Sequence, residues 1–75
     1  MSRLSELAVG QRGRVSQVEG NDAISTRLME MGVTSGVDVK IIGSAPLGDP
    51  LELELRGYRL SVRRSEAERV QLEDD

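Results

Sequence analysis

The chain has no cysteine and no histidine among its 75 residues. Disulfides, thiolate metal sites and histidine-based acid–base catalysis are therefore excluded. Phenylalanine and tryptophan are also absent, and Tyr58 is the one aromatic residue. The core must consist of aliphatic side chains, and a domain this small has only marginal stability.

Long apolar runs are missing too. No segment approaches the roughly 20 residues of a membrane-spanning helix, and the first residues lack the apolar stretch of a secretory signal. Because the absence of cysteine also fits a reducing compartment, we expect a cytoplasmic protein.

The net charge of −3 argues against nucleic-acid binding, which needs a surface that neutralises phosphates. We expect a single domain over 1–75, with its core over about 4–72.

The hydrophobic pattern predicts a mainly β fold. Apolar residues alternate in segments 13–18, 35–45, 51–57, 58–64 and 69–75, with a tight turn at 57–58 and a one-turn break at 65–68 capped by Ser65. The end of the last segment, 73–75, is expected to fray. The inward side chains are expected to be Val15, Val37, Val39, Ile41, Leu51, Leu53, Leu55, Leu60, Val62, Val70 and Leu72.

One short helix is predicted over 21–32. Ile24, Leu28 and Met31 share one helical face, Asn21 or Asp22 can cap the start, and Gly32 can end it. Five short strands that close into a barrel would hide their edges. We therefore expect a small five-stranded barrel with one short α-helix inserted after the first strand.

The chain's two prolines, Pro46 and Pro50, flank Leu47, Gly48 and Asp49. Proline fixes its own backbone and biases the preceding residue toward extended geometry, so this loop should be stiff. Leu47 then either tucks under the barrel or stays exposed as an apolar anchor for a partner, with little ordering cost on binding.

Two other groups are candidates for a binding surface. Met29 lies off the core face of the helix and could form an apolar patch beside Leu47. Arg63 belongs to an arginine-rich hairpin that also carries Arg56, Arg59 and Arg64. These arginines either pair with Glu52 and Glu54 across strands or reach the nucleotide of a GTPase partner.

Neither a metal site nor a catalytic site is predicted. Fe²⁺ sites draw on imidazole or carboxylates, and the nearest candidates, Asp49, Glu52 and Glu54, are more typical of a solvated strand face. The serines lack a histidine partner, and the sequence "VGQRGR" lacks the ending of a phosphate-binding loop. We expect no cofactor and no enzymatic activity.

The segments "TRLMEMGVTSGVDVKII" and "APLGDPLELELRGYRLSVRRSEAERVQL" resemble FeoA proteins, and "LSELAVGQRGRVSQV" also fits that family. The resemblance covers roughly residues 4 to 72. It implies an SH3-like barrel and a role in bacterial ferrous iron uptake, with transition metal ion binding known at the family level. FeoA is the small cytoplasmic companion of FeoB, a membrane permease with a GTP-binding domain. A similar domain occurs at the C-terminal end of metal-dependent repressors.

These observations lead to one hypothesis. The protein is a regulatory binding protein that acts on a FeoB-like GTPase transporter and reaches the membrane only through that partner. It would be a monomer or a weak homo-oligomer. The alternatives are a detached effector domain of a metal-dependent transcription regulator and a weak transition-metal-binding carrier. The expected docking residues are Pro46, Leu47, Gly48, Asp49, Pro50, Met29, Met31 and Arg63.

Overall fold

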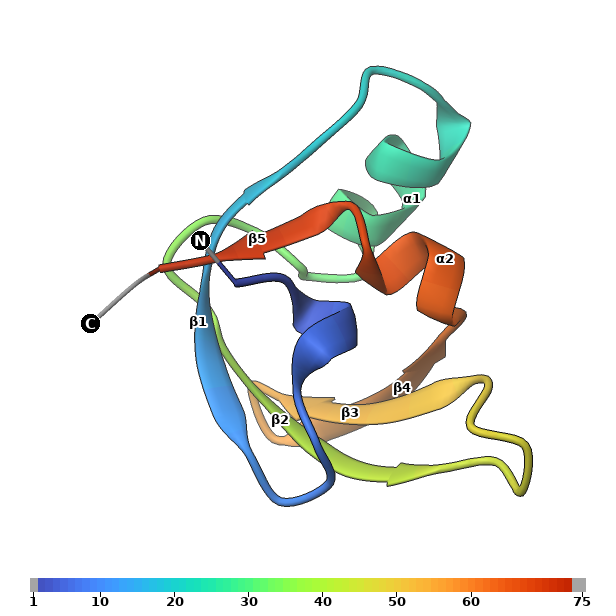
Figure 1. Cartoon of the computed structure of the whole chain (residues 1–75). Helices are drawn as coiled ribbons and strands as arrows, with labels where there is room; N and C mark the ends of the chain where they lie inside the picture. Colours follow the sequence, from blue (N-terminus) through green and yellow to red (C-terminus); the bar gives the residue numbers. More distant parts are fainter. Residues whose placement is uncertain (1, 74–75) are drawn as a thin grey trace.

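The computed structural model describes residues 2–73 and shows a curled antiparallel sheet with short helices on one side (Figure 1). The prediction that residues 73–75 fray lies largely outside the described residues. The elements, in chain order, are the 3-10 turn η1 (Leu4–Glu6), β1 (Arg12–Val18), α1 (Ala23–Glu30), β2 (Asp38–Ser44), β3 (Leu51–Leu55), β4 (Tyr58–Val62), α2 (Arg64–Ala67) and β5 (Val70–Leu72).

The five strands form one sheet in the order β4-β3-β2-β1-β5. The first half of β1 pairs with β2, and its second half pairs with β5. The pairing of β1 with β5 is irregular between Val15 and Gln17. Among residues 2–73, β4 and β5 do not pair with each other. The predicted five strands and the helix after the first strand are confirmed, but the sheet curls without closing into a complete barrel.

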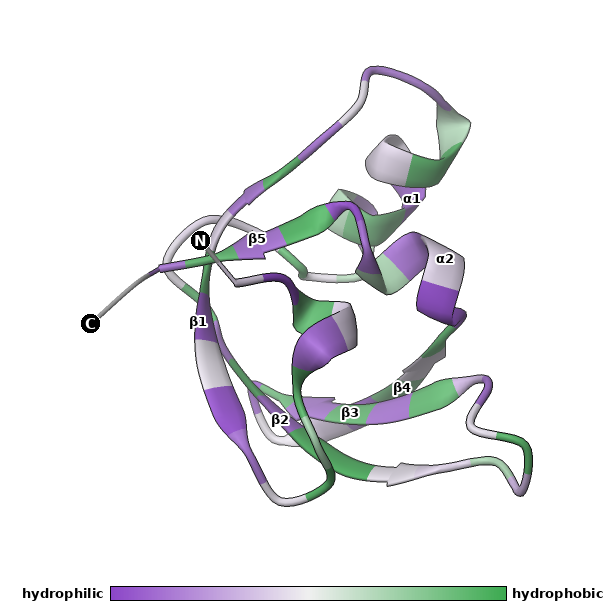
Figure 2. Ribbon diagram, in the orientation of Figure 1, coloured by the Kyte–Doolittle hydropathy of each residue, from purple (hydrophilic) through white to green (hydrophobic). Residues whose placement is uncertain are grey.

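The strand alternation buries an entirely aliphatic core. Leu51, Leu53 and Leu55 are buried while Glu52 and Glu54 are exposed, and Figure 2 shows the same alternation along β3. Leu60 is only partly buried. The buried core residues are Leu4, Val15, Leu28, Val33, Val37, Val39, Ile41, Leu51, Leu53, Leu55, Val62, Ala67, Val70 and Leu72.

Helix α1 begins and ends where capping chemistry places its limits. The Asp22 side chain accepts the backbone N–H of Ser25, which satisfies one of the free donors of the first turn. Leu28 is buried, and Ile24 and Met31 pack partly exposed against the core. The longest helix has eight residues, and no helix within residues 2–73 is long and apolar enough to cross a membrane.

Two local predictions were wrong. The turn between β3 and β4 is Arg56–Gly57, not 57–58, and both turn residues have positive φ, 51° and 83°. A two-residue turn of this kind matches the twist of the flanking strands. The break after β4 is a second short helix, α2, whose N-cap is Arg63 rather than Ser65. The cause is Glu66, whose carboxylate accepts the Arg63 N–H at 2.9 Å.

Candidate functional site

The proline-flanked loop between β2 and β3 projects an apolar side chain into solvent. Leu47 is 96% exposed, more than any other large apolar side chain within residues 2–73. The loop is closed at its base by a bond from the Ala45 N–H to the Pro50 carbonyl, 3.0 Å, and at its tip by one from the Gly48 N–H to the Ala45 carbonyl, 2.7 Å. Gly48 has a φ of +83°, which glycine adopts without steric cost. Leu47 therefore does not tuck under the barrel; its role as an anchor for a partner stays a prediction.

Arg64, the first residue of α2, fixes this loop from the side. Its backbone N–H donates to Asp49 Oδ1 at 3.0 Å and its Nε donates to the Gly48 carbonyl at 2.8 Å. Its Nη1 also reaches the Ser5 carbonyl at 3.0 Å. The loop is therefore ordered by the rest of the domain as well as by its prolines. The sequence prediction left Arg64 out of the site, although the arginine pair that contains it was the available signal.

A surface hollow of about 420 Å³ lies between the end of α1, the base of the loop and α2. It brings together three of the predicted docking residues, Met31, Pro50 and Arg63, which come from three separate segments. The lining is completed by Arg27, Ser61 and Glu66. The size is within the range of sites that hold a small ligand or a side chain of a partner.

The electrostatics of this hollow centre on one buried carboxylate. The Glu66 side chain is 8% exposed and pairs through Oε2 with Arg27 of α1, while its Oε1 accepts the Arg63 N–H. This pair joins α1 to α2. The Arg63 guanidinium forms no ion pair with another residue of the described chain and stays exposed at the rim. The hollow thus combines apolar lining residues, Met31 and Pro50, with the exposed Arg63.

Met29 and Leu47 do not form the expected common patch. Met29 is 46% exposed on α1, and Figure 1 shows α1 and the tip of the loop well apart, with α2 between them. Near Met29, the end of α1 is held by the Tyr58 hydroxyl, which donates to the Met31 carbonyl. The predicted docking residues therefore divide into an exposed loop tip, a hollow and a separate helix surface.

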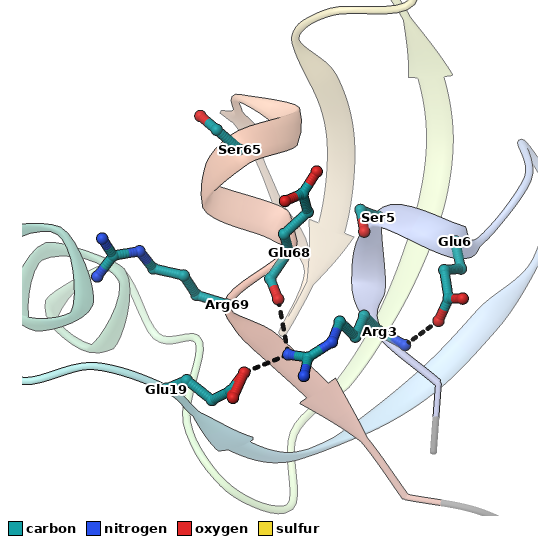
Figure 3. A pocket seen from close by; sticks show the side chains of 7 residues that line it. All are labelled: Arg3, Ser5, Glu6, Glu19, Ser65, Glu68 and Arg69. Atoms are coloured by element: carbon teal, nitrogen blue, oxygen red, sulfur yellow. Dashed lines mark hydrogen bonds and ion pairs between the residues drawn. The ribbon is translucent and has the colours of Figure 1, made fainter.

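A second hollow, of about 520 Å³, lies where η1, the end of β1, α2 and β5 meet (Figure 3). Its arginines are already partnered. Arg3 donates to Glu19 and, at 2.9 Å, to the Glu68 carbonyl. Arg69 turns away from Arg3 and binds Asp22 at 2.6 Å. The Arg3 contacts join the start of the chain to the end of β1 and to the segment before β5, and the Arg69 contact joins that segment to the start of α1. They have a structural role.

The same ion pairs shift the acidity of their carboxylates. The hydrogen bond from Arg3, followed by one from Gln71, lowers the pKa of Glu19. The hydrogen bond from Arg69, followed by the backbone N–H of Ser25, lowers the pKa of Asp22. Each bond favours the charged carboxylate, which is the physical cause of the shift.

The described residues offer little for metal binding or catalysis. No group of three or more carboxylates is arranged within residues 2–73 as a metal site would require, and the chain has no imidazole or thiol. The prediction that no metal is held tightly stays a prediction. What the arrangement presents is an exposed apolar loop tip at Leu47 and a hollow lined by Arg63.

Comparison with known proteins adds a family. The FeoA domain model matches residues 2–74. A Porphyromonas gingivalis protein that fuses Fe(2+) transport protein A to the Fe(2+) transporter FeoB is 35% identical over 71 residues. That match covers 95% of this chain but only 8% of the fusion protein. The chain therefore corresponds to one small part of that relative.

Solved structures support the same assignment. The FeoA protein of Chlorobium tepidum is 41% identical, with a TM-score of 0.86 over 95% of this chain and 68% of its own. Stenotrophomonas maltophilia FeoA, complexed with zinc and described as a prokaryotic SH3 domain protein, is 35% identical, with a TM-score of 0.84 over 97% of this chain and 91% of its own. The expected SH3-like fold is confirmed. A manganese-dependent transcriptional repressor, 10% identical with a TM-score of 0.81 over 92% of this chain and 39% of its own, shows the fold alone.

Proposed function

The chain belongs to the FeoA family, and from this premise we propose that it is a non-catalytic accessory protein of bacterial ferrous iron uptake. Its partner would be the cytoplasmic part of a FeoB-like GTPase transporter. The fusion protein of Porphyromonas gingivalis supports this pairing, because it carries both components in one chain. A cytoplasmic location follows from the proposal.

The observation that carries the proposal is the exposure of Leu47 on an ordered loop. An apolar side chain that is 96% exposed gains free energy when a partner covers it, roughly 1.5–3 kcal/mol for full burial of a leucine. The loop is already held by Arg64 and by its own backbone bonds. Little conformational entropy is then lost on docking, which is the condition that favours an anchor residue.

The proposed surface follows from this anchor. Leu47 would insert into the partner, with Pro46, Gly48, Asp49 and Pro50 presenting it. The hollow at Met31 would accept an apolar group of the partner, and Arg63 at its rim would set orientation through charge. Met29 lies on the separate surface of α1 and would contribute only if the partner extends over that helix.

The test is the substitution Leu47→Glu. Binding of the purified variant to the transporter in detergent should fall by about tenfold or more, and ferrous iron uptake by cells that carry it should fall as well. The matched control is Val9→Glu, since Val9 is also an exposed apolar residue, at 60%, but lies in another turn. Wild-type binding and uptake by a folded Leu47→Glu variant would contradict the proposal.

Stimulation of GTP hydrolysis is a separate, finer question. If Arg63 reached the nucleotide, hydrolysis by the partner's GTP-binding domain would rise on addition of this protein and not of Arg63→Ala. The two alternative functions gain no support from the described residues. The similarity to repressors is one of fold, and residues 2–73 present no cluster of three or more donor residues that would favour a metal carrier.

A further inference from the structure

The outer edge of β4 is the open end of the sheet. β4 pairs only with β3, in the register Leu55↔Tyr58, Leu53↔Leu60 and Leu51↔Val62, and no other strand among residues 2–73 lies beside it. An unpaired edge exposes backbone donors and acceptors that can pair with another chain. Its chemistry therefore decides what can bind there.

The backbone groups that face outward belong to Arg59 and Ser61. In a two-residue hairpin the closing residues exchange both hydrogen bonds, and such pairs alternate along the ladder with pairs that make none. Leu55↔Tyr58 closes this hairpin, so Arg59 and Ser61 direct their N–H and C=O groups away from β3. Neither residue makes a backbone hydrogen bond elsewhere in the described chain, and both are exposed.

The edge ends at Arg63. Its N–H donates to Glu66 Oε1 at 2.9 Å, and its carbonyl accepts the N–H groups of Glu66 and Ala67 at the start of α2. The open stretch is therefore short and has a defined end. Beside it, a hollow leaves room next to the strand; it is lined by Ser61, by Arg27 of α1 and by Met31, which follows α1.

The charge on this edge selects its occupant. The strand alternation places the side chains of Arg59 and Ser61 on the outer face, and the extended backbone of Arg63 continues β4. Arg59 lies across from Glu54 of β3, but neither the Arg59 nor the Arg63 guanidinium forms an ion pair within residues 2–73. A strand with carboxylates at alternate positions would meet these arginines as cross-strand pairs of opposite charge. A second copy of β4 would instead bring the arginines of both copies onto one face, and like charges across a ladder are destabilising.

We propose that the open edge of β4 takes up an extended acidic segment of a partner protein as an additional strand, with alternate carboxylates facing Arg59 and Arg63. This mode of recognition obtains affinity from the main chain and specificity from alternate side chains. The contact is distinct from docking through Leu47 and does not depend on the identity of the transporter.

The probe is the synthetic peptide Thr-Glu-Val-Glu-Val-Glu-Thr, titrated into isotope-labelled full chain at low salt, with the matching lysine peptide as comparison. We expect the largest amide shifts at Arg59 and Ser61 and weaker binding of the lysine peptide. Ser61→Pro should weaken binding by about tenfold, because it removes one outward N–H. Proline is tolerated where the N–H faces solvent on an edge strand. Ser61→Thr keeps that N–H and should bind like wild type.

A second variant covers the case in which Ser61→Pro does not fold. Arg59→Glu combined with Arg63→Glu changes exposed side chains only and should prefer the lysine peptide. Equal affinity for both peptides, or amide shifts confined to β5 or to the loop at Leu47, would overturn the proposal. So would a wild-type dimer that Ser61→Pro dissociates, since the occupant would then be a second copy. Leu47→Glu should bind the acidic peptide normally, which separates this inference from the proposed function.

Discussion

The two edges of the sheet are treated in opposite ways. The edge of β5 is covered by the start of the chain, where the Leu72 N–H donates to the Ser2 carbonyl at 2.8 Å and Arg3 bridges to Gln71. The edge of β4 has no such cover within the described residues. Both edges carry arginine, but Arg3 is paired with Glu19 whereas Arg59 is not. One edge is therefore part of the fold, and the other is available for recognition.

The largest expected loss of stability comes from Leu4, a core residue next to the covered edge of β5. Leu4 lies in η1, directly after the residues that cover β5, and is fully buried. Leu4→Ala should lower the free energy of unfolding by about 2–5 kcal/mol, because it leaves a cavity in a close-packed core. The matched change on the open edge, Leu60→Ala, removes a partly buried side chain and should cost about 1 kcal/mol. Urea unfolding of both variants measures the difference; equal losses would contradict the distinction.

Much of this architecture was predictable from the sequence. Leu51, Leu53 and Leu55 alternate with charged residues, and a strand with one buried face must show that period. The capping of α1 by Asp22 was equally local. The turn at Arg56–Gly57 was misplaced because Arg56 adopts a positive φ of 51°, which is uncommon for a residue with a side chain.

The candidate site was only half predictable. Pro46 and Pro50 indicated a stiff loop, but its fixation by Arg64 joins residues 15 and 16 positions apart, and a single sequence does not show such contacts. The separation of Met29 from Leu47 likewise depends on where α2 lies. Local chemistry identified the parts, and tertiary packing decided which of them meet.

The second prediction concerns Tyr58, the first residue of β4, whose hydroxyl binds the Met31 carbonyl at the end of α1. Gly32 has a φ of +99°, and a Cβ at this position would collide with the Tyr58 hydroxyl. Gly36 has a φ of +88° and open space around it. Gly36→Ala should therefore cost about 1–2 kcal/mol from backbone strain alone, while Gly32→Ala should cost about 1 kcal/mol more, because the Tyr58 bond to Met31 is lost.

A double-mutant comparison isolates that bond. In the background Tyr58→Phe the hydroxyl is gone, so Gly32→Ala and Gly36→Ala should destabilise the protein equally. Thermal unfolding of the four variants and their parents gives the comparison. An excess cost of Gly32→Ala that persists with Phe at position 58 would show that the collision involves atoms other than the Tyr58 hydroxyl.

The third prediction tests a residue that links the two regions. Arg64 follows β4 and α2 begins with it, yet its Nη1 reaches the Ser5 carbonyl in η1, next to the segment that covers β5. Arg64→Ala removes the two side-chain bonds to Gly48 and Ser5 and should cost about 1 kcal/mol, since both are exposed. Its larger effect should be on the loop, where NMR relaxation of the Leu47 and Gly48 amides would report increased motion. Unchanged relaxation would mean that the prolines and the backbone hydrogen bonds at Ala45, Gly48 and Arg64 order the loop without the Arg64 side chain.

The smallest effect is a loss of stability at low pH. It should weaken the β5 edge, which has ion pairs, and not the β4 edge, which has none within the described residues. Glu19 and Asp22 have pKa values lowered in the folded protein by Arg3 and Arg69, so the native state binds fewer protons than the unfolded chain. Their stabilisation is present above the ordinary pKa of about 4 and is lost as pH falls through the lower folded values. Asp22 is exposed and Glu19 is half-buried, so the loss should be modest and reduced by salt.

Urea unfolding at pH 6, 4.5 and 3 should show a decline only in the last interval. In the double variant Glu19→Gln, Asp22→Asn that decline should be smaller, and asparagine still caps the helix. Amide exchange should locate the loss, with Gln71 and Leu72 of β5 losing protection on acidification while Leu53 and Leu60 of the β3–β4 hairpin keep it. If the hairpin lost protection first, the covered edge would not depend on its ion pairs, and the contrast between the two edges would be one of backbone pairing alone.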